Sequence, residues 1–236
     1  MKNKNKRNPI VSIVGGIAAA AVIIGTVAFL TSYDEVTNVF SAGNLSILLT
    51  EPHYEPDNAG NITPYKQIDK DPVIRNNGTN DIYVFLRITV PVSKVTELNE
   101  YGTAKDGNTP KLQELFYLKK QSIGINELKT EFNSDNWIEL TDVEAGGEYN
   151  GDTWEYKEGT TTRTYVFGYK EILKPNEVTA TLFDKVQLKN LKEQPVPDTI
   201  TQVIGVEAFA IQADNLDGTG NEINKDNLTK IYKMIK

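Results

Sequence analysis

The sequence predicts a mainly β protein, an antiparallel β-sandwich with short helices, preceded by an N-terminal signal or transmembrane helix. Three observations predict this class. Short segments rich in β-branched and aromatic residues recur along the chain, separated by clusters of Gly, Pro, Asn and Asp. Residues 10–30 form an uncharged apolar run behind a basic start. The chain of 236 residues has no cysteine, so its stability must come from a hydrophobic core rather than from disulfides.

Residues 1–28 have the layout of a signal peptide. Four basic residues within the first seven precede the apolar run, which is long enough to cross a bilayer as a helix of roughly 20 residues. The small residues Thr26 and Ala28 stand where a signal peptidase reads side chains, which predicts cleavage before Phe29. A retained membrane anchor is the alternative, although no basic stop-transfer cluster follows the run. Both interpretations deliver the rest of the chain to the outside of the cell.

We expect residues 29–43 to form a linker or donor strand and residues 44–236 to form a β-sandwich domain. Residues 111–118 and 222–236 have helical apolar spacing, whereas residues 51–70 and 102–110 have the composition of loops. The predicted strands, in chain order, are residues 44–50, 71–75, 82–91, 137–140, 152–156, 163–173, 179–188 and 201–213.

Residues 82–91 form the strongest predicted strand. Val84, Leu86, Ile88 and Val90 alternate with residues that point to the opposite face, so the segment has two faces to bury and is expected at the centre of a sheet. The preceding Asn77-Gly78 pair favours a tight turn with positive φ.

Charge and composition exclude several function classes. Residues 1–28 contain four of the 25 basic residues and none of the 32 acidic ones, so the mature chain would have a net charge near −11. Such a surface repels nucleic acid and anionic lipid. Without cysteine there is no thiolate nucleophile and no zinc–thiolate site.

Catalytic motifs are also missing from the sequence. The sequence has no Gly-x-Ser-x-Gly motif and no phosphate-binding loop. His53 is the only histidine, and because it lies in a polar loop we expect its side chain to be solvated. The closely spaced acids of residues 69–71 and 142–144 are expected to solvate strand ends. We therefore expect neither an enzyme nor a bound cofactor.

A weak calcium candidate lies at Asp214, Asn215 and Asp217. The segment has oxygen ligands and glycines, but Ala213 stands where an EF-hand has its first carboxylate and Asn224 where it has its bidentate glutamate. A plain polar turn is therefore favoured over a metal site. The two tryptophans, Trp137 and Trp154, lie in predicted strands and are expected to pack rather than to bind sugar.

Several segments resemble the TasA/camelysin (CalY) family of exported proteins. The resemblance covers nearly the whole mature chain and is most specific near its start. It is carried by GTVAFLTS at residues 25–32, TNVFSAGNL at 37–45, LTEP at 49–52, KDPVIRNNGTND at 70–81, LFDKV at 182–186 and VEAFAIQA at 206–213.

This resemblance implies a jelly-roll-like sandwich, processing by a SipW-type signal peptidase in a Gram-positive bacterium, and secretion to the cell surface or extracellular matrix. It also implies assembly into biofilm matrix fibres, in which an N-terminal strand of one subunit completes the sheet of the next. The donor residues would be Phe29, Leu30, Tyr33, Val36, Val39 and Phe40. Some family members are described as metalloproteases, but this chain lacks a His-Glu-x-x-His motif, so that activity is not expected.

The apolar residues of the donor segment recur at helical spacing, at Tyr33, Val36 and Val39 or Phe40. Before cleavage the segment could therefore prolong the signal helix. A simple tether, or pairing within its own subunit, is an alternative to donation.

The sequence thus predicts a secreted fibre subunit that assembles by strand donation. Its partners would be the signal peptidase and copies of itself or of a related subunit, with membrane contact only through the uncleaved signal. The alternative is a monomeric cell-surface binding or adhesion module, whose site would be formed by loops such as 51–70 and 100–110.

Overall fold

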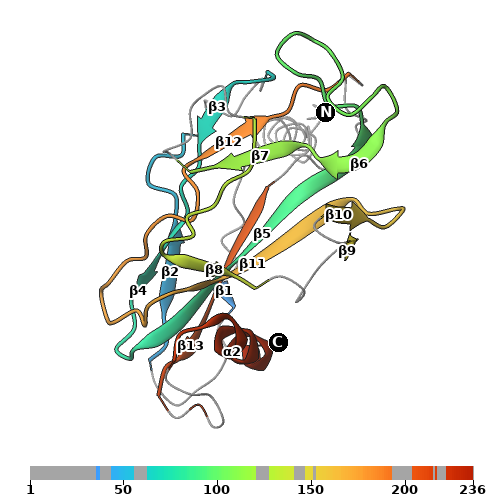
Figure 1. Ribbon diagram of the computed structural model, residues 1–236. Helices are drawn as coiled ribbons and strands as arrows, with labels where there is room; N and C mark the ends of the chain where they lie inside the picture. Colours follow the sequence, from blue (N-terminus) through green and yellow to red (C-terminus); the bar gives the residue numbers. More distant parts are fainter. Residues whose placement is uncertain are drawn as a thin grey trace, which may run out of the picture.

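The computed structural model shows a mainly β protein (Figure 1). Within the residues that it describes, the strands pair antiparallel apart from one parallel pair. It describes residues 36–37, 44–55, 63–120, 128–140, 147–150, 153–192, 204–214, 216 and 222–235. The elements are β1 (Val36–Thr37), β2 (Ile47–Thr50), β3 (Gln67–Asp69), β4 (Val73–Asn76), β5 (Ile82–Val95), β6 (Lys111–Glu114), β7 (Phe116–Lys119), β8 (Trp137–Glu139), β9 (Gly147–Asn150), β10 (Thr153–Tyr156), β11 (Thr162–Tyr169), β12 (Lys185–Leu188), β13 (Gly205–Gln212) and α2 (Lys225–Ile235).

The largest sheet has the strand order β1-β13-β5-β11-β8, and β6 pairs with the end of β5 beyond β11. β5 is the central strand, as predicted, because β11 and β13 pair along its two sides. Smaller sheets, β3-β12-β7 and β2-β4, supply further strands to the fold (Figure 1). Two isolated bridges, Arg75 with Val178 and Ile82 with Leu173, connect the strands to the loop after β11.

Both faces of β5 are buried, as its alternating pattern predicts. Val84, Leu86 and Ile88 lie in the main core, together with apolar residues of β2, β4, β7 and β12. Tyr83 and Phe85 point to the opposite face and pack in a second cluster under α2. A central strand buried on both faces explains why this segment is apolar almost throughout.

The C-terminal helix α2, which the sequence predicts, covers the second face of the large sheet. Leu228, Ile231 and Tyr232 of α2 are fully buried there, and the Tyr232 ring lies 5.4 Å from that of Phe85. Gly168 of β11 permits this packing, because a Cβ atom there would lie 2.9 Å from Leu228 Cδ1.

The predicted helix over residues 111–118 is wrong, because this segment forms the two strands β6 and β7. β6 pairs with residues 92–95 and β7 pairs with β12. The chain bends at Leu115, between the two strands, and the apolar alternation of β6 does not continue into β7. The resulting spacing of apolar residues is therefore similar to that of a helix. The predicted loop over residues 51–70 also contains a strand, β3, stabilised by its pairing with β12.

Gly78 does not have the positive φ that the Asn-Gly pair predicts, since the described glycines with positive φ are Gly102, Gly107 and Gly159. Glycine is needed at this position because there is no space for a side chain. A Cβ atom at Gly78 would lie 2.4 Å from the carbonyl oxygen of Asn44, so only glycine fits beside the start of the domain.

Candidate functional site

The predicted processing and donor residues lie mostly outside the described residues. Thr26, Ala28, Phe29, Leu30, Tyr33, Val39 and Phe40 are not among them, whereas Val36 is part of β1. β1 is extended, although the spacing of Tyr33, Val36 and Phe40 is typical of a helix. No helix within the described part of the chain is long and apolar enough to span a membrane.

β1 lies at the edge of the large sheet, in parallel with β13 (Figure 1). Val36 is opposite Ala208 and Thr37 is opposite Phe209. The other side of β13 pairs with β5 over all eight of its residues. The outer edge of β13 is therefore a place where an extended segment adds to the central sheet of this fold.

The side chains of β13 point alternately to the two faces of the large sheet. Ala208 and Ala210 are buried in the main core, whereas Phe209 packs edge-to-face on Tyr232 of α2 with a ring distance of 6.0 Å. Glu207 pairs with Arg87, whose guanidinium lies 5.2 Å from the Phe209 ring. A strand added here meets apolar surface on both faces.

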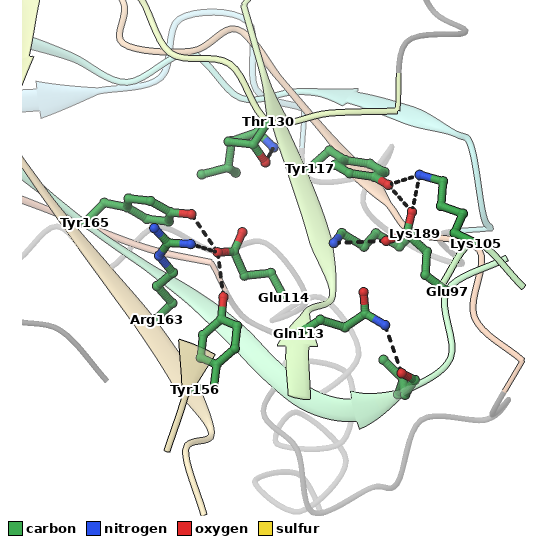
Figure 2. Close-up of polar contacts among 12 residues, drawn as sticks. Glu97, Lys105, Gln113, Glu114, Tyr117, Thr130, Tyr156, Arg163, Tyr165 and Lys189 are labelled. Atoms are coloured by element: carbon green, nitrogen blue, oxygen red, sulfur yellow. Dashed lines mark hydrogen bonds and ion pairs between the residues drawn. The ribbon is translucent and has the colours of Figure 1, made fainter. Parts of the chain in front are cut away.

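A second feature is a buried polar network around Glu114, at the end of β6 (Figure 2). Its Oε1 accepts hydrogen bonds from the Tyr165 hydroxyl at 2.6 Å, the Tyr156 hydroxyl at 2.9 Å and Arg163 Nη1 at 3.0 Å. Burial and the Glu114 charge raise the pKa of both tyrosines above the ordinary value. The tyrosines therefore stay neutral donors, and the network fastens β6 and β10 to β11.

A similar network surrounds Glu97, on the other side of β6 and β7 in Figure 2. Glu97 accepts hydrogen bonds from Lys105 and Tyr117 and forms an ion pair with Lys189 at 3.2 Å. Burial raises the pKa of the Glu97 carboxyl, but Lys189, Lys105 and Tyr117 outweigh it and hold that pKa below its ordinary value. Glu97 is therefore a fixed, charged anchor for the loop that contains Lys105.

A cavity of about 270 Å³ lies beside these networks. It is lined by the end of β5 and the residues after it, by the start of β6, by loop residues 106–109, and by Tyr156 of β10. The loop belongs to the 100–110 region that the sequence predicts as a possible binding loop.

His53, predicted to be solvated, is exposed yet has a partner. Its backbone N–H donates to Asp71 Oδ1 at 3.0 Å, and its ring Nδ1 lies 2.6 Å from Asp71 Oδ2. Next to Asp71, Lys70 is fully buried and donates to Glu51 at 2.7 Å. These two pairs fasten the segment after β2 to the segment between β3 and β4, so their role is structural.

The carboxylate candidates gather no metal site within the described residues, where no group of three His, Asp or Glu is placed to bind an ion. Asp214 is exposed just after β13, while Asn215 and Asp217 lie outside the described residues, as do residues 142–144. Asp69 pairs with Lys185, and Asp71 binds His53. Trp137 is buried in the core, as predicted, and the Trp154 side chain is outside the described set.

The sequence gives no local signal for the two networks. The partners of Glu114 lie 42 to 51 residues away in the chain, and Lys189 comes from a loop beyond β12. A buried carboxylate is recognised only when the fold brings its partners to it.

Comparison with protein-family models, with curated proteins and with solved structures found no match to this chain. The resemblance to the TasA/camelysin family therefore stays a prediction from the quoted residues.

Proposed function

We propose that this protein is an exported structural subunit of an extracellular matrix or surface fibre. In this proposal a signal peptidase of the SipW type cuts before Phe29, and the freed N-terminal segment adds as a strand to another copy or to a related subunit. We further propose that the sheets belong to a jelly-roll-like sandwich, as the resemblance implies.

The observation that carries the proposal is the parallel pairing of β1 with β13. In the single chain, residues 36–37 of the predicted donor segment pair with β13 of their own subunit at the outer edge of the central sheet, which is the arrangement that the sequence leaves open as an alternative to donation. The same backbone positions of β13 can accept the equivalent segment of a second copy, since strand addition depends on main-chain hydrogen bonds. Exchange of β1 between copies would preserve the register of Ala208 and Phe209 and convert an internal pairing into a link between subunits.

Donor variants test the assembly step. Protein that begins at Phe29 should form fibres, visible by negative-stain imaging and light scattering, and deletion of residues 29–40 should leave monomers. Thr37→Pro should block assembly, because proline has no N–H for the ladder, whereas the matched Thr37→Val keeps a β-branched residue and should assemble. Monomers at every concentration and pH, unaffected by the deletion, would refute strand donation.

The processing step has its own readout. Intact-mass analysis of the secreted protein should give a chain that starts at Phe29. A mass that retains residues 1–28 would instead identify a membrane-anchored protein, for which donation before cleavage is not expected.

The alternative function is a monomeric cell-surface binding or adhesion module. The observation that favours it is the cavity of about 270 Å³ beside loop residues 106–109. Binding of a surface ligand without fibre formation would support this alternative over the fibre subunit.

A further inference from the structure

The cavity beyond the end of β5 has the size of a site for one small ring. Its volume of about 270 Å³ lies just below the range of roughly 300–1,000 Å³ that holds drug-sized ligands. Three separate segments and Tyr156 of β10 converge on it, so its shape depends on the folded sheet rather than on one loop.

Its walls combine apolar and polar groups. The lining includes the apolar residues Val95 and Leu112 and the aromatic Tyr156. It also includes Asp106 and Thr109, whose side chains offer oxygen acceptors and a hydroxyl donor. A six-membered sugar ring has the matching chemistry, because its C–H face packs on aromatic rings and its hydroxyls both donate and accept hydrogen bonds.

Two lining side chains, Tyr156 and Gln113, are already held by hydrogen bonds within the protein. The Tyr156 hydroxyl lies 2.9 Å from Glu114 Oε1, and Gln113 Nε2 donates to the Val95 carbonyl at 2.8 Å. That bond leaves the Gln113 side-chain oxygen available as an acceptor. A fixed wall lowers the entropy cost of binding a small ligand.

The charges around the cavity largely offset one another. Glu97 is a charged lining residue, and Lys105 and Lys189 pair with it. Asp106 and Lys111 are exposed lining residues of opposite charge. Two carboxylates, Glu97 and Asp106, face three ammonium groups, Lys105, Lys189 and Lys111, so a single positive charge is left over, and salt screens it where the lysine is exposed.

We propose that this cavity binds a single neutral sugar residue of a surface or matrix glycan. The ring of Tyr156 packs against the face of the sugar, and Asp106, Thr109 and Gln113 bind its hydroxyls. The site does not depend on strand donation, since β6 and β10 lie away from β1 and β13 in Figure 1. A fibre subunit and a monomeric adhesion module could both carry it.

Saturation-transfer NMR on the full chain, kept in a detergent without sugar head groups, tests the proposal. The probes are the methyl glycosides of glucose, galactose, mannose and N-acetylglucosamine. At least one should bind with a dissociation constant of about 1 mM, as expected for a ligand of roughly a dozen heavy atoms.

Substitutions on the exposed loop locate the site without disturbing the core. The double variant Asp106→Asn, Thr109→Val should weaken binding at least about ten-fold, because it removes a charged acceptor and a hydroxyl. Glu171→Gln, at an exposed carboxylate beyond the other end of β11, is the matched control and should bind like the parent. Tyr156→Ala should abolish binding, and Tyr156→Phe, which keeps the ring, should restore most of it.

Three results would overturn the proposal. One is the absence of saturation transfer from every glycoside at about 50 mM, well above the expected dissociation constant. Another is unchanged binding in the loop double variant, which remains decisive even if Tyr156→Ala fails to fold. The third is tighter binding of a zwitterionic amino acid than of any glycoside, which would assign the cavity to a different ligand class.

Discussion

Single residues with buried charge hold distant strands of this protein together. Glu114 receives three hydrogen bonds from β10 and β11, and Lys70 is fully buried against Glu51. The ring of Tyr54 lies 5.2 Å from the Lys70 ammonium. Such pairs tolerate poorly the loss of one partner, since the remaining charge stays buried without compensation.

Glu114→Gln is therefore expected to destabilise the fold by about 3 kcal/mol, because Arg163 loses its ion pair in a mostly buried site. Urea denaturation measures the change. The control is Asp135→Asn, which breaks the more exposed pair with Lys120 and should leave the unfolding midpoint unchanged. Equal midpoints for the two variants would contradict a structural role for the Glu114 network.

The ion pair between His53 and Asp71 makes a contribution to stability that depends on pH. A hydrogen bond to Asp71 and the charge of Asp71 raise the pKa of His53 above its ordinary value near 6.5. Because the folded pKa is raised, the contribution of this pair to stability is complete below about pH 6.5 and is lost as pH rises through the folded pKa.

The imidazole titration of His53, the only histidine, should therefore give a pKa above about 6.5 by proton NMR. Asp71→Asn should return the pKa toward that value, since it removes the charge but keeps a hydrogen-bond acceptor. A pKa that is not raised, or one that is equal in the two proteins, would refute the pairing in solution.

At the scale of elements, the packing of α2 on the sheet depends on the missing side chain of Gly168. A Cβ atom there would lie 2.9 Å from Leu228 Cδ1 and 3.3 Å from Phe85 Cε1. The helix buries Leu228, Ile231 and Tyr232 on this surface, so it has little freedom to move away.

Gly168→Val should lower the free energy of unfolding by about 1–3 kcal/mol through overpacking, measured by thermal or urea unfolding. Gly205→Ala is the control, because its Cβ atom would make an ordinary contact of 3.5 Å with Thr89. The losses caused by Gly168→Val and Leu228→Ala should add up to more than the loss in the double variant, because both changes act on one contact. If Gly168→Val unfolds at the same denaturant concentration as the control, the close approach of helix and sheet is wrong.

At the scale of the whole molecule, charge opposes the proposed assembly. A mature chain with a net charge near −11 repels its copies, and the backbone pairing at the β13 edge must overcome that repulsion. The electrostatic repulsion between copies is long-ranged and is screened by salt, whereas the hydrogen bonds of strand pairing act only at short range.

Fibre elongation should therefore become faster when the ionic strength is raised from about 10 mM to about 150 mM, because the Debye length falls from about 30 Å to about 8 Å. Light scattering of protein that starts at Phe29 measures the rate. Thr37→Pro should remain monomeric in both buffers, which separates strand pairing from nonspecific precipitation. Slower elongation at high salt would mean that opposite charges, rather than backbone pairing, drive the contact.

The sequence alone predicts the mainly β class, the central strand and the terminal helix. Each of these depends on patterns within one segment, such as the alternation in residues 82–91 that the two buried faces of β5 confirm. The pattern fails at residues 111–118, where two short strands meet at Leu115 and their pairing partners are β5 and β12. No local rule distinguishes that spacing from a helix, because the deciding contacts are distant in the chain.

The sequence by itself determined a basic and then apolar N-terminal run, an acidic composition without cysteine, and many of the strand segments. Only the tertiary structure decided which edge of the sheet β1 occupies, which charges are buried around Glu114 and Glu97, and where the cavity forms. The physical reason is the distance along the chain over which each effect acts. Alternation and turn residues act over a few positions, whereas register, ion-pair burial and cavity shape arise from segments that meet only after folding.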